Sequence, residues 1–177
     1  VVVAVGTAGG VVEPGLLDEG RNNYLVAVAW DGKGLDTPSA TQRKGFDTPS
    51  ATQPAVIGLA YADITTGEFA ATQIEGPEAE RMLRQELARL QPAEILVREQ
   101  GKEGKLRKDG EEAFPSFPPT SLTSLPAWQF ELETARRVLL EQFEVESLAA
   151  FGVDGLPQAV RAAGALVQYL QTTQRGS

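Results

Sequence analysis

The stretch that decides the fold runs Val56-Ile-Gly-Leu-Ala-Tyr-Ala-Asp-Ile-Thr-Thr-Gly-Glu-Phe-Ala-Ala-Thr-Gln73. Two apolar segments, Val56–Asp63 and Glu68–Gln73, flank the turn sequence Ile64–Gly67. The glycine suits the positive φ that tight hairpin turns require, so the two segments are predicted to be antiparallel strands. Upstream, Tyr24–Trp30 is almost entirely apolar, which indicates a strand buried on both faces of a sheet. Together the three segments predict an antiparallel meander.

A helix and a further strand are predicted after the meander. Gly76-Pro77 opens the helix, because proline suits the first helical position, and Gln91-Pro92 ends it. Apolar residues recur in between at helical spacing, namely Ala79, Met82, Leu83, Leu87 and Leu90. Ala93–Val97 then forms a short strand. Because a helix connects it to the sheet, we expect this strand to be a parallel crossover.

The region before the last helix is predicted to hold one more strand. Residues 101–119 are first charged and then proline-rich, which indicates a long exposed connection. Trp128, Phe130 and Leu132 then alternate with polar residues, and this period is typical of a half-buried strand. Thr134 is expected to cap a helix that extends to residue 143.

Pro157 opens a final helix that runs to about Arg175. Its apolar residues lie on two sides, because Val160 and Val167 share one face while Leu166 and Tyr169 share another. Such a helix is normally buried by more than one neighbour. The sequence ends soon after it, so we expect most of its cover to lie beyond the chain.

Composition excludes several classes of protein. The 177 residues include neither cysteine nor histidine, which rules out disulfides, thiolate or imidazole metal sites and histidine acid–base catalysis. The net charge of -8 repels a phosphate backbone, so direct nucleic-acid binding is not expected. No segment has the length of a membrane span, and the N-terminus lacks the features of a signal peptide. We therefore expect a soluble, cytoplasmic chain.

An 11-residue tandem duplication stands between the first two predicted strands. Lys33–Arg43 is repeated as Lys44–Pro54, with differences only at the third and last positions. The repeat is too short to build a repeat fold, and its Thr, Ser, Pro and Gly content is typical of a surface loop. We interpret residues 33–54 as an expanded hairpin tip. The alternative, a partner-binding Thr-Pro tract, predicts weaker binding after deletion of Lys44–Pro54, whereas a tolerated insertion predicts no effect.

Candidate chemical sites are weak. Gly6, Gly9 and Gly10 lack the spacing of a phosphate-binding loop. Asp63 and Glu68 could begin a two-metal nuclease site, but such a site needs three or four converging carboxylates. The other acids near predicted element ends are Glu94 and Asp154. A turn-capping aspartate is the simpler interpretation of Asp63, because such side chains bond their own turn.

Several strings, in order, resemble the connector domain of bacterial MutS proteins, the DNA mismatch-recognition ATPases, followed by the first helix of their lever region. The resemblance covers nearly the whole chain apart from the duplicated loop and residues 101–126. It is carried by Arg21–Leu25, Gly58–Phe69, Gln91–Leu96, Glu133–Arg136, Phe151–Val153, Ala162–Gly164 and Leu170–Arg175.

This resemblance implies a ribonuclease-H-like α/β fold, without that fold's catalytic carboxylates. We expect a mixed sheet of about five strands flanked by helices, with a C-terminal helix leading out of the domain. The implied organisation is a linker over 1–20, the connector over 21–153, and the helix leading into the lever over 154–177. No Walker A loop or Phe-x-Glu motif is present, so ATP, Mg²⁺ and DNA would be bound by other parts of the parent protein.

The resemblance also implies a role and a partner. Connector domains join the mismatch-binding domain to the lever and ATPase parts, and they contribute to contact with MutL. Carried over to this sequence, the contact falls on the helix over 134–143. The partner-binding residues expected there are Arg136, Arg137, Val138 and Glu141, although helical spacing also places Val138 at the edge of the core.

Overall fold

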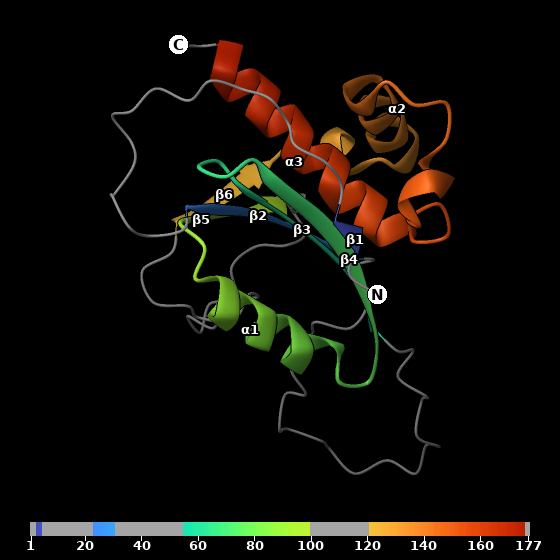
Figure 1. Cartoon of the computed structure of the whole chain (residues 1–177). Coiled ribbons are helices and arrows are strands. Elements are labelled where there is room, and N and C mark those ends of the chain that lie inside the picture. The colour runs from blue at the N-terminus through green and yellow to red at the C-terminus, as the bar shows by residue number, and fades with distance from the viewer. Residues whose placement is uncertain (1–2, 5–22, 31–54, 100–120, 176–177) are drawn as a thin grey trace, which may run out of the picture.

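The computed structural model describes residues 3–4, 23–30, 55–99 and 121–175. Within these residues, six strands form one sheet with α-helices on both faces (Figure 1). The strand order is β1-β4-β3-β2-β5-β6. Three features discussed above lie outside the described residues: the glycines at 6, 9 and 10, the duplicated loop at 33–54, and the connection over 101–119.

The predicted meander is confirmed. Its strands are β2 (Tyr24–Trp30), β3 (Ala55–Asp63) and β4 (Glu68–Gly76), and each pairs antiparallel with the next. Gly67 adopts a φ of 74° in the connecting turn, a backbone region that glycine reaches without steric cost. A two-residue strand, β1 (Val3–Ala4), pairs antiparallel with β4 at the edge of the sheet.

Helix α1 (Ala79–Leu90) carries the chain from β4 to β5 (Glu94–Arg98), which pairs parallel with β2 as expected for a crossover. The helix begins two residues after Pro77 rather than at it. Of the predicted apolar stripe, Met82 is 44% exposed and does not join the core, while the other four members are buried.

The sequence interpretation missed a strand. β6 (Ser121–Leu125) pairs parallel with β5, although its sequence is short and largely polar. Three antiparallel strands, with two more parallel to the first, give the ribonuclease-H-like arrangement that the resemblance implied.

The predicted strand through Trp128 and Leu132 is wrong. The structure has a 3₁₀ helix there, η2 (Ala127–Phe130), and α2 (Leu132–Phe143) starts almost at once. Phe130 is buried at the end of this short helix, whereas Trp128 is 54% exposed, so the alternating apolar residues do not share one buried face. The helix is preceded by Glu131 rather than by Thr134, so the predicted cap is also wrong.

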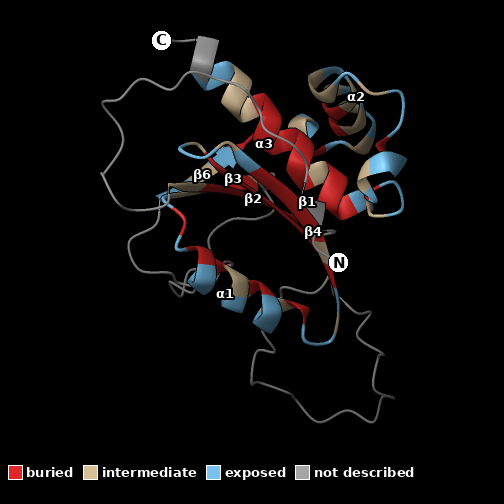
Figure 2. Ribbon diagram, in the orientation of Figure 1, coloured by how far each residue is buried: buried red, intermediate tan, exposed pale blue. Residues whose placement is uncertain are grey.

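Helix α3 (Pro157–Arg175) follows the 3₁₀ helix η3 (Leu148–Phe151) and packs across β2, β3 and β4, with α2 on its outer side (Figure 1). The expectation that its cover lies beyond the chain is therefore wrong for its first three turns. Both apolar sides of the helix have a neighbour, because the sheet covers one and α2 the other. Its last turn is more exposed (Figure 2).

Side chains on the central strands alternate in size. On β2, Val26 and Val28 face α1, whereas Ala27 and Ala29 face α3. On β3, large side chains face α1, while Gly58, Ala60 and Ala62 lie on the opposite side. A Cβ atom added at Gly58 would lie 1.9 Å from the carbonyl oxygen of Gln158, so the start of α3 sits directly on the strand backbone.

Candidate functional site

Helix α2 is held on α3 by very close packing. Ala135 and Leu139 are buried in the contact between the two helices. A Cβ atom added at Gly164 would lie 2.4 Å from the Cα atom of Ala135, so the absence of a side chain at Gly164 permits the approach. At its C-terminal end α2 also reaches the sheet, where the rings of Phe143 and Phe69 lie 5.7 Å apart. The position of α2 is thus fixed relative to both α3 and the sheet.

The four residues expected to bind a partner divide into two pairs. Arg136 is half-buried, and its guanidinium donates a hydrogen bond of 2.7 Å to the carboxylate of Asp154. Val138 is half-buried against the hydrophobic core. Arg137 and Glu141 are exposed and lie four residues apart, on one side of the helix. We call these two residues the outer face of α2.

The surroundings of this outer face are acidic. Arg137 is the one cation between residues 131 and 147 that is exposed and outside the ion pair with Asp154, in a stretch that the structure describes throughout. Exposed carboxylates there come from Glu131, Glu133, Glu141, Glu144 and Glu146. The local field therefore disfavours phosphate groups, in line with the net charge. Both arginines were expected at this contact from the sequence, whereas the exposed acids around them were not.

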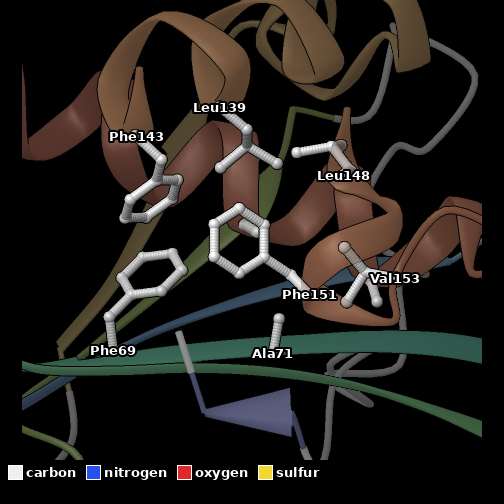
Figure 3. Close-up of a pocket in the computed structure, with 9 residues that line it drawn as sticks. Phe69, Ala71, Leu139, Phe143, Leu148, Phe151 and Val153 are labelled. Carbon is white, nitrogen blue, oxygen red and sulfur yellow. The ribbon is translucent and has the colours of Figure 1, made fainter. Parts of the chain in front are cut away.

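An apolar pocket lies beneath α2, between β4, η3 and α3 (Figure 3). Two aromatic rings that line the pocket, those of Phe143 and Phe151, have centroids 5.5 Å apart. The empty volume, including the open mouth, is about 290 Å³. Sites for small molecules combine apolar walls with a few polar groups that orient the ligand. Since every lining residue is apolar, this pocket is a packing seam rather than a binding site.

Asp63 acts as a turn residue, as the simpler interpretation proposed. It is buried, and its Oδ1 accepts a hydrogen bond of 2.8 Å from the backbone N–H of Thr65. Opposite it on β4, Glu68 accepts a hydrogen bond of 3.3 Å from the hydroxyl of Tyr24. Burial and the neighbouring Glu68 carboxylate raise the pKa of Tyr24. Both carboxylates are therefore engaged in structural contacts.

The carboxylates considered for a nuclease site do not converge. Asp63 shares the α1 side of the sheet with Tyr61, whereas Glu94 shares the α3 side with Leu96. The carboxylate of Asp154 forms an ion pair with Arg136. No group of three or more metal-ligating side chains occurs in the part of the chain that the structure describes. The nuclease interpretation thus gains no structural support.

The hydrogen bonds of Glu94 were not expected from the sequence. Its carboxylate accepts from the hydroxyl of Tyr169, at 2.9 Å to Oε1 and 3.1 Å to Oε2, and from the hydroxyl of Thr123. Burial and the adjacent carboxylate raise the pKa of Tyr169, so the phenol stays protonated and remains a donor. These residues come from β5, β6 and α3, so only the folded structure brings them together.

Among the described helices, none is long and apolar enough to span a membrane.

Comparisons with known proteins agree on one family. The family described as MutS domain II matches residues 23–177. Three similar proteins are each named DNA mismatch repair protein MutS. The one from Synechococcus sp. is 43% identical over 175 residues, covering 97% of this chain and 18% of the relative. The one from Dehalococcoides mccartyi is 37% identical over 173 residues, with coverages of 97% and 16%.

The third relative, from Chloroflexus aurantiacus, is 35% identical over 205 residues, which cover 98% of this chain and 19% of that protein. The chain therefore spans less than a fifth of the length of each of these three relatives.

Proposed function

Because the chain belongs to the MutS domain II family, we propose that it is the non-catalytic connector module of a MutS-type DNA mismatch repair protein. In this role it relays conformational changes between the mismatch-binding and ATPase parts of the parent protein, and it contributes to the docking of a MutL-type partner. ATP, Mg²⁺ and DNA are bound by other parts of the same cytoplasmic protein.

The observation that carries the docking role is the outer face of α2. This helix packs on the outer side of α3, and it presents Arg137 and Glu141 to solvent. By contrast, Arg136 and Val138 are engaged within the domain, through Asp154 and the core respectively. We therefore assign partner contact to Arg137 and Glu141, and we assign support of the helix to Arg136 and Val138.

The relay role is supported by how rigidly α2 is mounted. Its backbone approaches α3 at Gly164 too closely for either helix to slide freely. The ion pair between Arg136 and Asp154 adds a second tie, to the segment that precedes α3. A partner that moves α2 would therefore also move α3.

Charge reversal at Arg137 tests the docking role most directly. In the full-length parent, we expect Arg137→Glu to weaken ATP-dependent association with the MutL-type partner about ten-fold, because it makes an already acidic surface uniformly negative. Association is measured by crosslinking or pull-down with purified proteins, and repair by the mutation frequency of cells that carry the variant.

Arg81→Glu is the matched control. Arg81 is also exposed and also on a helix, but α1 lies on the opposite side of the sheet. We expect Arg81→Glu to leave the association with the MutL-type partner unchanged. If Arg137→Glu preserved both association and repair, the assignment of docking to α2 would be wrong.

A further inference from the structure

The carboxylate of Glu94 lies where three elements meet. Glu94 is the first residue of β5, and only three residues separate it from the end of α1. Thr123 lies in the middle of β6. Tyr169 belongs to the later turns of α3, beyond Val167, the last fully buried apolar residue of that helix. All three hydrogen-bonding side chains are half-buried. They connect the end of α3 to the two strands at one edge of the sheet.

Apolar packing weakens along α3, and polar contacts take its place. Gln168 donates to the backbone carbonyl of Gln129 in η2 at 3.0 Å, and Gln171 donates to the side chain of Gln142 in α2 at 2.9 Å. Tyr169 is the residue of this group that reaches the sheet. Hydrogen bonds to a charged acceptor are stronger than neutral ones, particularly away from bulk water.

We propose that Glu94, Thr123 and Tyr169 form a latch that couples the end of α3 to β5 and β6. While the latch is closed, the last turns of α3 and the β5–β6 pair move as one unit; when it opens, each fluctuates independently. The proposal of the latch is based on the hydrogen bonds that join these three residues. Its use as a route for signals rests on the relay role proposed above.

Hydrogen–deuterium exchange on the full 177-residue chain tests the latch. Tyr169→Phe keeps the ring but removes the donor, so the fold should persist. We expect exchange to become about ten-fold faster both in residues 169–175 and in the strands at 94–98 and 121–125, which corresponds to about 1.4 kcal/mol. Glu94→Gln should act on the same segments, and the double variant should be no faster than the stronger single one.

Tyr24→Phe is the matched control, because it also removes a tyrosine–glutamate hydrogen bond but at the turn between β3 and β4. It should leave exchange at 121–125 and 169–175 unchanged. Faster exchange confined to α3 in Tyr169→Phe would overturn the proposal, since it would mean that the bond only anchors the helix end. Unchanged exchange would overturn it as well. Neither result depends on the MutL-type partner, so failure of the docking assignment remains distinguishable.

Discussion

On one face of the sheet, α1 packs leucines against valine, isoleucine and leucine side chains; on the other, β2 and β3 present mostly alanine and a glycine to α3, although Leu25 and Leu96 also lie on that side. The first contact is held by large side chains that fill the space between the layers. In the second, the backbones themselves come close. The side chains at both contacts are buried, but the two contacts are expected to tolerate substitution differently. The α1 face should be sensitive to lost atoms, and the α3 face to added ones.

The largest expected effect is at Gly58. Its substitution by alanine places a methyl group 1.9 Å from a backbone carbonyl oxygen of α3, and backbone cannot turn away as a side chain can. We expect Gly58→Ala to lower the free energy of unfolding by about 4 kcal/mol, measured by urea denaturation. Gly155→Ala is the control, because nothing lies within 4 Å of its added Cβ atom. A loss below about 1 kcal/mol at Gly58 would show that the α3 face is not closely packed.

A deletion tests the α1 face. Leu83 is fully buried against the sheet, so Leu83→Ala should leave a cavity and lower the free energy of unfolding by about 3 kcal/mol. Met82, its exposed neighbour on the same helix, provides the control: Met82→Ala should change stability by no more than about 0.5 kcal/mol. Equal losses at the two positions would contradict the conclusion that Leu83 fills the contact between α1 and the sheet while Met82 lies outside it.

A smaller effect is expected between α2 and α3. Gly164→Ala brings a Cβ atom to 2.4 Å from Ala135, but alanine also favours the helix, so we expect a net loss of about 2 kcal/mol. Ala135→Gly removes one of the two clashing atoms. Combining the substitutions should therefore cost less than the sum of their separate effects, which a double-mutant cycle measures. Strict additivity would argue against direct contact.

Much of the fold could be predicted from local pattern. The meander followed from apolar segments around Gly67, and the crossover followed from a helix placed between two strands. By contrast, β6 was missed because Ser121–Leu125 is short and polar, and its place in the sheet depends on pairing with β5. The apolar run Tyr24–Trp30 was correctly interpreted as a central strand. Its alternation of valine with alanine, which distinguishes the two faces, was present in the sequence but was not used.

The candidate site was harder to predict, because it depends on tertiary contacts. Arg136 was expected to bind a partner, yet Asp154, eighteen residues away, pairs with it. Nothing local in the sequence joins Glu94 to Tyr169, which are separated by seventy-five residues. The apolar circumference of α3 was recognised, but the sequence could not say that α2 and the sheet would supply the cover.

The place of α3 in the sequence also bears on how the chain is synthesised. This helix leaves the ribosome after β2 and β3, the strands that it covers in the folded module. Until it arrives, the alanine-rich side of the sheet is an open apolar surface in a nascent chain, the kind of surface that chaperones bind. We expect a stop codon early in α3 to prevent folding of the whole module rather than merely shorten it.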